Sequence, residues 1–258
     1  MKLLVCIKQV PDMESRFKPN SAGTWYSDSD LAWRMNEYDE YAVEQAVRLR
    51  EQLGDETELT VLSIGPDRVV EAIKKSLAMG CDRAVHIQDP AIYEKDPWQV
   101  AGIIAAYAND QAYDLIFTGM QSQDRGSAQV GVTVAELLQY ACATTLVGFA
   151  FENGVVTAKR ELEGGIKGVA RLPIPALVTC QLGLNVPRYP TLPNLMKSKK
   201  KEILSIPVAD LLKEQALVQT ASFHPPSKKG VGIVLEGDVG ELVQKVMGIL
   251  KEKTTVLR

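Results

Sequence analysis

The segment best suited to chemistry is the loop of residues 119–131, which is rich in glycine, serine and glutamine. An apolar strand pattern at residues 114–118 precedes it, and a helical pattern ending at residue 138 follows it. Such loops hold nucleotide phosphates in α/β proteins, because free backbone N–H groups and the positive helix end both attract an anion. The loop has neither the Gly-Lys-Ser/Thr ending of a Walker loop nor a G-x-G-x-x-G fingerprint. Spacing alone therefore fits equally a nucleotide site of another kind and an ordinary turn whose small residues serve packing.

The other reactive residue types indicate neither a catalytic nor a metal site. No C-x-x-C pair occurs among the cysteines, and each lies in or beside an apolar stretch, which argues against zinc and against a disulfide framework. They are Cys6, Cys81, Cys142 and Cys180. His86 lies in a strand-like run and His224 is distant from it, so a hydrolytic triad is not indicated.

Composition favours an intracellular globular protein. The 258 residues carry a net charge of -3, so no basic field points to nucleic acid. No apolar run approaches the roughly 20 residues that a membrane-spanning helix needs. The apolar start at residues 3–7 is too short for a signal peptide. We expect the cytoplasm of a bacterium or, in a eukaryote, the mitochondrial matrix.

The first half alternates strand and helix patterns. Strands are predicted at residues 3–10, 59–64, 83–87 and 114–118. Helices are predicted after Asn36, after Pro66 and at residues 97–109, and Gly54 and Gly80 end the first two. This alternation predicts a parallel sheet with helices on both faces. The loops at residues 9–12, 64–65 and 119–131 then share the carboxyl edge, where such sheets bind ligands.

The second half predicts antiparallel strands added to that sheet, followed by an arm. Strand patterns lie at residues 144–151, 155–162, 168–172 and 176–180. A long irregular loop, 181–205, follows within a domain of residues 1–213. Residues 214–230 resemble a linker, and residues 231–235 a strand before a helix with an apolar face. A lone strand and helix cannot bury both apolar faces, so we expect the arm 214–258 to dock on another chain, the alternative being that it folds back.

Several segments, in this order, resemble the β subunit of electron-transfer flavoproteins. They are residues 5–11 (VCIKQVP), 36–40 (NEYDE), 42–46 (AVEQA), 77–83 (LAMGCDR), 124–131 (DRGSAQVG), 160–165 (RELEGG) and 187–193 (PRYPTLP). The resemblance implies a three-layer nucleotide-binding fold like that of adenine-nucleotide α-hydrolases. It also implies a heterodimer in which the α subunit holds the redox-active FAD and receives the C-terminal arm. The β subunit would hold AMP or, in electron-bifurcating members, a second FAD.

Carried over by these motifs, the resemblance implies a nucleotide pocket that spans four segments. Its residues would be Cys6, Asn36, Glu37, Tyr38, Asp39, Ile64, Asp124, Arg125, Gly126, Ser127, Ala128, Gln129, Val130, Gly131, Val132, Thr133, Val134 and Ala135. The backbone N–H groups of residues 126–129 and the Ser127 hydroxyl would meet the phosphate. Cys6 and Ile64 would flank adenine, although core packing is the better explanation of them when the resemblance is set aside. Asn36 and Asp39 would bond to ribose or to adenine edges.

The loop 181–205 resembles the family's recognition loop, which docks acyl-CoA dehydrogenase-type flavoproteins. The implied contact residues are Tyr189, Leu192, Pro193 and Met196. Leu192 would enter an apolar pocket of the partner, and burying it is worth only about 1.5–3 kcal/mol, which suits a transient complex. Without the resemblance, a proline-rich surface loop is the alternative.

We therefore expect a carrier subunit that passes electrons to a membrane quinone oxidoreductase, with no catalytic side chain and no metal. Residues 128–131 resemble bifurcating members, whereas residues 192–196 resemble simple carriers, and we favour AMP. Arg125 either contacts the phosphate or crowds a longer cofactor. An electron-bifurcating subunit with a second FAD and an AMP-binding regulatory module without a redox role are the alternatives. An adenylating ligase lacks support, because residues 9–12 are not its Ser-Gly-Gly-x-Asp-Ser loop.

Overall fold

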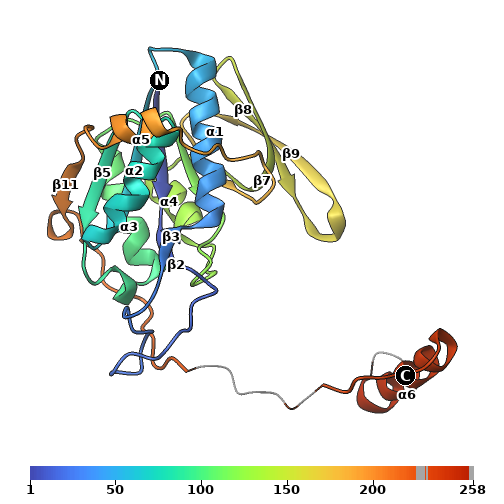
Figure 1. Cartoon of the computed structure of the whole chain (residues 1–258). Coiled ribbons are helices and arrows are strands. Elements are labelled where there is room, and N and C mark those ends of the chain that lie inside the picture. Colours follow the sequence, from blue (N-terminus) through green and yellow to red (C-terminus); the bar gives the residue numbers. More distant parts are fainter. Residues whose placement is uncertain (225–229, 231, 256–258) are drawn as a thin grey trace. The chain divides into compact units, whose positions relative to one another are not determined.

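The computed structural model describes residues 1–224, 230 and 232–255. The chain divides into two compact units, Met1–Phe223 and His224–Arg258 (Figure 1). Each helix within the described ranges is too short or too polar to cross a lipid bilayer.

A nine-stranded sheet forms the centre of the first unit, in the order β11-β5-β4-β1-β6-β10-β7-β8-β9. Its parallel part comprises β11 (Leu204–Pro207), β5 (Arg83–Gln88), β4 (Glu58–Gly65), β1 (Lys2–Ile7), β6 (Leu115–Gly119), β10 (Ala176–Cys180) and β7 (Ala141–Glu152). Antiparallel pairing adds β8 (Val155–Glu161) and β9 (Lys167–Pro173), which project beyond the helices in Figure 1. A separate antiparallel pair joins β2 (Gln9–Pro11) to β3 (Trp33–Met35).

Helices cover both faces of the sheet, which makes the predicted three layers. On one face, α1 (Glu37–Leu53) and α2 (Val70–Met79) contribute to a core that includes Leu3 and Val5 of β1. On the other, α3 (Pro97–Asn109) and α4 (Val130–Leu138) contribute to a core that includes Leu4 and Cys6. Successive β1 side chains point to opposite faces, so an unbroken apolar strand serves two cores. Single 3-10 turns lie at Asp67–Val69, Ile92–Glu94, Glu163–Gly165 and Val208–Asp210.

The predicted antiparallel character of residues 176–180 is wrong. β10 lies between β6 and β7 and is parallel to both, with Ala176 beside Leu115 and beside Ala141. All five of its residues are buried, as a central parallel strand requires. An apolar run of this length fits either kind of pairing, so the sequence pattern could not decide its place.

The sequence predicts an irregular loop over residues 181–205, but the structure contains a helix and the start of a strand there. A short helix, α5 (Leu192–Ser198), begins after Thr191, whose hydroxyl accepts a hydrogen bond from the Asn194 N–H at 3.4 Å. Pro193 lies in its first turn, where a missing N–H is tolerated. Beyond it, β11 adds an edge strand to β5. The prolines that suggest a loop are thus compatible with a helix start.

Two features of the predicted arm differ in the structure. The first unit continues to Phe223, because Asp96 Oδ2 accepts hydrogen bonds from the N–H groups of Leu217 and Val218 at 2.6 and 3.0 Å. The predicted strand at residues 231–235 is absent over residues 232–235, because no described strand lies beside them to form backbone hydrogen bonds. Val231 and the linker residues 225–229 lie outside the described residues.

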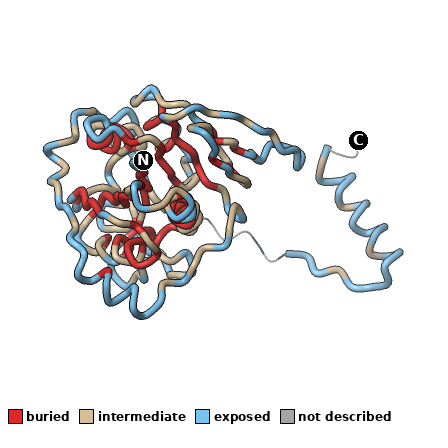
Figure 2. Tube along the Cα trace, turned by 90° about the horizontal axis from the view of Figure 1, so that it is seen from above, coloured by how far each residue is buried: buried red, intermediate tan, exposed pale blue. Residues whose placement is uncertain are grey.

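The predicted C-terminal helix is present as α6 (Val239–Lys253), and Asp238 caps it. Figure 2 shows the buried residues concentrated in the sheet and helices of the first unit, whereas α6 contains none. The second unit therefore has no core of its own among its described residues.

Candidate functional site

A cleft opens at the carboxyl edge of the sheet, where β1 lies between β4 and β6. The chain leaves β1 toward β4 and later returns on its other side to β6, so the loops after these strands diverge. Residues of all three predicted loops line this cleft, among them Gln9, Ile64 and Gly119. The strand order thus forms the site.

The structure brings together many, but not all, of the residues expected at a nucleotide. Those lining the cleft are Cys6, Asn36, Asp39, Ile64, Asp124, Arg125, Ser127, Ala128, Gln129, Val130 and Gly131. Those outside its lining are Glu37, Tyr38, Gly126, Val132, Thr133, Val134 and Ala135. Val134 and Ala135 belong to the apolar core beneath α4, because they occupy its inward face.

The end of the cleft at α4 has the character of an anion site. Ala128 has φ +53°, and Gln129 is the residue from which α4 starts. Among the described residues, the N–H groups of Ser127, Ala128 and Gln129 have no acceptor in the protein. The expected contribution of Gly126 is wrong, because its N–H already donates to the Ser122 carbonyl at 2.8 Å. Three of the four expected donors therefore remain for a phosphate.

Asn36 and Asp39 organise the loop rather than offering free groups to a ligand. The Asn36 amide donates to the Gln121 carbonyl at 2.9 Å and accepts from the Gln123 N–H at 3.0 Å. Asp39 accepts from the Lys8 N–H at 2.7 Å and from the Gly119 N–H at 3.1 Å. Both side chains are buried and already bonded, so the predicted contacts to ribose or adenine are not their first role.

Burial shifts the pKa values of several groups around this cleft. It raises the pKa of Asp39 to about 7, although hydrogen bonds from Lys8 and Gly119 oppose the change. It also raises the pKa of the Cys6 thiol, which therefore stays neutral and serves as an apolar wall. Burial lowers the pKa of Lys8, but the neighbouring Asp124, whose carboxylate lies 2.7 Å from Lys8 Nζ, opposes this change. No group here is arranged as an activated nucleophile.

Arg125 closes one side of the cleft. Its guanidinium donates to the Lys95 carbonyl at 3.0 Å and to the Tyr93 carbonyl, and it lies 4.4 Å from the centre of the Trp25 ring. Lys95 in turn pairs with Asp89 at 2.8 Å. Residues 93–95 and the loop before α4 are therefore joined across the cleft by one side chain. We call Arg125 and Trp25 the clasp.

The sequence did not indicate the aromatic rim of the cleft. Trp25 and Tyr26 come from the segment between β2 and β3, Trp33 begins β3, and Arg68 lies 3.7 Å from the centre of the Trp33 ring. The only signal was a group of aromatic residues in an otherwise polar stretch, with no periodicity to place it. Tertiary packing alone brings this segment over the cleft.

The cleft fits an adenine nucleotide by its chemistry. Cys6, Ile64 and Ile104 give it an apolar lining suited to a base, and the N–H groups before α4 belong to residues that line the same cleft. Three residues that line it each have a buried polar atom without a partner among the described residues, as occurs where a water or a ligand completes a site. These atoms are Gln9 Oε1, Trp25 Nε1 and Arg68 Nε.

The residues expected to recognise a partner protein lie away from this cleft, and all four are exposed. Tyr189 is 94% exposed, Leu192 78% and Met196 61%, and Pro193 beside them is exposed as well. Three large apolar side chains on one short segment form a surface suited to protein contact.

Comparisons with known proteins agree with the motifs. The model of the electron transfer flavoprotein domain matches residues 24–211. The electron transfer flavoprotein subunit beta of Bacillus subtilis (strain 168) is 34% identical over 262 residues, covering 100% of both chains. That of Methylophilus methylotrophus is 32% identical over 261 residues, covering 98% of each. That of Mus musculus is 36% identical over 241 residues, covering 92% of this chain and 93% of the relative. This chain, by its motifs, its fold and these relatives, belongs to the electron transfer flavoprotein β-subunit family.

Proposed function

We propose that this chain is the β subunit of a simple electron carrier that holds AMP structurally. Its α subunit would bind the FAD, which supplies the one-electron chemistry when bound. The complex would accept electrons from acyl-CoA dehydrogenase-type flavoproteins and deliver them to a membrane quinone oxidoreductase, in a bacterial cytoplasm or a mitochondrial matrix. The observation that carries the nucleotide part is that three consecutive N–H groups before α4, without an acceptor among the described residues, and an apolar lining belong to one cleft.

The side chains of this chain would bind and position, without acid or base chemistry. The N–H groups of residues 127–129 would take the phosphate, and Cys6 and Ile64 would contact the base. Asn36 and Asp39 would keep the loop in the shape that aims those N–H groups. The nucleotide would thus stabilise the subunit by binding only its folded state.

The clasp favours AMP over a second FAD. Arg125 is held by two carbonyls and by the Trp25 ring, so it narrows the cleft, and a cofactor longer than a mononucleotide would have less room there. A mononucleotide needs no space beyond the phosphate end. The alternative, an electron-bifurcating subunit, would require this side chain to move aside.

The exposed segment around Leu192 supports transient docking of a dehydrogenase, and α6 supports attachment to the α subunit. α6 exposes a row of apolar side chains at helical spacing: Val239, Val243, Val246, Met247 and Leu250. Such a face is unfavourable in water and suits a permanent partner.

The decisive experiment is to purify the chain with its α subunit and to identify the nucleotides released on denaturation. We expect one FAD and one AMP for each heterodimer. Two FAD and no AMP would establish the bifurcating alternative. AMP without any flavin or α subunit would favour the regulatory module and would overturn the proposal.

A further inference from the structure

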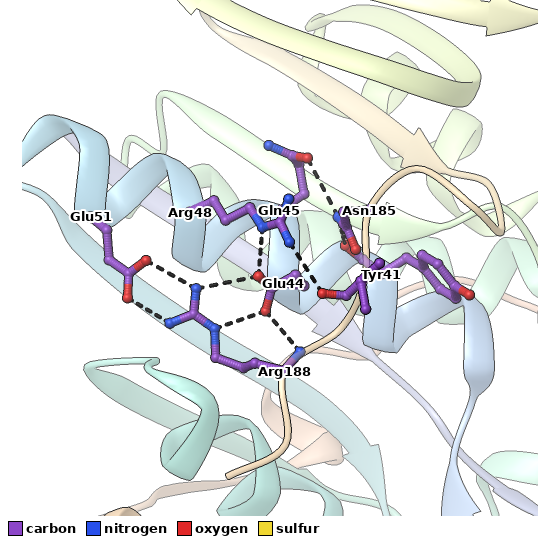
Figure 3. Close-up of polar contacts among 8 residues, drawn as sticks. Tyr41, Glu44, Gln45, Arg48, Glu51, Asn185 and Arg188 are labelled. Atoms are coloured by element: carbon purple, nitrogen blue, oxygen red, sulfur yellow. Dashed lines mark hydrogen bonds and ion pairs between the residues drawn. The ribbon is translucent and has the colours of Figure 1, made fainter. Parts of the chain in front are cut away.

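Three of the residues 185–188, namely Asn185, Val186 and Arg188, are hydrogen-bonded to α1 (Figure 3). The Arg188 guanidinium reaches Glu44 Oε2 through Nε at 2.8 Å. It also reaches both oxygens of Glu51, through Nη1 at 2.6 Å and Nη2 at 2.9 Å. The two carboxylates lie on one face of α1, nearly two turns apart, and one planar guanidinium joins them.

Glu44 makes this attachment strong because its carboxylate is buried. Its side chain is 2% exposed and accepts from Arg48 Nε at 2.6 Å and from the Arg188 N–H at 3.1 Å. Burial alone would raise the pKa of Glu44, but hydrogen bonds from Arg188 and Arg48 outweigh it, and the pKa is lowered. Removing Arg188 would leave a buried charge short of partners, which proteins tolerate poorly.

The two residues before Pro187 are also hydrogen-bonded to α1. Arg48 Nη2 donates to the Val186 carbonyl at 3.2 Å, and the Asn185 amide donates to the Tyr41 carbonyl at 3.0 Å. The chain is therefore bonded to α1 at three successive points before it reaches Tyr189.

The exposed residues that follow have a second attachment at α5, which packs against α2. Its last residue, Ser198, is buried, and after it Lys201 Nζ donates to the Cys81 carbonyl at 2.6 Å. The side chains of Tyr189, Leu192 and Met196 are themselves exposed, so they contribute little to holding the segment. On the N-terminal side, its position depends on the contacts of residues 185–188 with α1.

We propose that Arg188, together with Glu44 and Glu51, is the anchor that holds residues 189–198 in the conformation that a flavoprotein partner binds. The inference rests on the proposed docking function. Anchoring lowers the ordering entropy that association must overcome, so it strengthens docking without any contact to the partner. Arg188 is a positioning residue, and its planar fork, rather than its charge alone, bridges the two carboxylates.

The test compares wild-type heterodimer with Arg188→Gln, Arg188→Lys and Glu51→Gln. We expect Arg188→Gln to speed amide hydrogen exchange over residues 189–198 at least about 10-fold. It should raise the apparent KM for a purified acyl-CoA dehydrogenase about 5-fold, with kcat and nucleotide content unchanged. Arg188→Lys should rescue only part of both effects, because an ammonium group cannot form the double fork. Glu51→Gln, which changes a carboxylate near the surface, should raise the apparent KM by only about 2-fold. This variant provides the test if Arg188→Gln folds poorly.

The matched control is Arg171→Gln, which changes an exposed arginine of β9 that has no ion pair within the described part of the chain. It should match wild type in exchange and KM. Unchanged exchange at 189–198 in Arg188→Gln, or faster exchange with an unchanged KM, would overturn the anchor. A wild-type complex that takes no electrons from the dehydrogenase would instead contradict the proposed function. In that case the amide exchange rates over residues 189–198 would still show whether Arg188 holds the segment in place.

Discussion

Asn36 occupies the position that begins α1, yet its side chain makes no capping bond to that helix. It bonds instead to the backbone of Gln121 and Gln123, more than eighty residues later. A residue of good capping type thus serves a distant loop, because two partly buried backbone groups there need partners. Side-chain chemistry at this position is explained only by its tertiary surroundings.

At this scale we predict that Asn36→Ala weakens nucleotide retention. The change removes the partner of the partly buried Gln123 N–H and of the Gln121 carbonyl, which costs about 1 kcal/mol. AMP content of the purified heterodimer and urea unfolding of the chain measure the two effects. Asn109→Ala, which changes an exposed asparagine at the last position of α3, is the control. Wild-type AMP content and stability in Asn36→Ala would refute this role.

At the cleft, the N-terminus of α4 packs closely against the ends of β6 and β10. Gly131 is where these elements come closest. A Cβ there would lie 2.7 Å from Thr118 Oγ1 and 2.9 Å from Thr179 Cγ2. The glycine therefore lets the N-terminus of the helix approach the sheet edge.

Gly131→Ala should consequently destabilise the chain by about 1–3 kcal/mol through overpacking and displace the phosphate end of the cleft. Adding Thr179→Ser removes one of the two clashing atoms while keeping the hydroxyl that accepts from the Thr145 N–H, so it should restore part of the loss. Gly248→Ala in α6, where a Cβ meets open space, should be neutral or stabilising. Equal urea midpoints for Gly131→Ala and wild type would show that the contact relaxes freely.

The attachment of residues 185–188 to α1 should depend on pH. Hydrogen bonds from Arg188 lower the pKa of Glu51, and the pKa of Glu44 is also lowered, from an ordinary value of 4.5. Below that value the unfolded chain binds more protons than the folded one, so stabilisation is complete above pH 4.5 and is lost on further acidification. The difference in unfolding free energy between wild type and Arg188→Gln should therefore be largest near pH 7 and shrink toward pH 3. A difference that stays constant over this range would contradict the ion-pair account.

At the scale of the whole molecule, the two units have different sources of stability. Met1–Phe223 contains apolar clusters on both faces of its sheet. The described residues of His224–Arg258 contain none, and its helix exposes an apolar face. The first unit should fold alone, whereas the second needs a partner.

We therefore predict that deleting residues 224–258 leaves the unfolding free energy of the remainder within about 1 kcal/mol while reducing recovery of the α subunit. Two point variants locate the effect on α6. Val243→Lys should disrupt heterodimer formation, because it places a charge on the apolar face. Gln244→Lys, which introduces the same side chain one position away, should not. Equal co-purification of both variants would rule out this face as the attachment.

The sequence by itself determined the alternation of the main strands and helices in the first half of the chain and the family, while the phosphate-type loop stays a prediction. Periodicity, glycine stops and motif order are local properties, so they survive without the fold. Only the tertiary structure decided that β10 lies inside the parallel sheet, that Trp25 and Arg125 close the cleft, and that Arg188 pairs with Glu44 across 144 positions. The physical reason is that these features depend on distant surfaces meeting. Burial and hydrogen-bond satisfaction over the whole chain select those contacts, and no short segment encodes them.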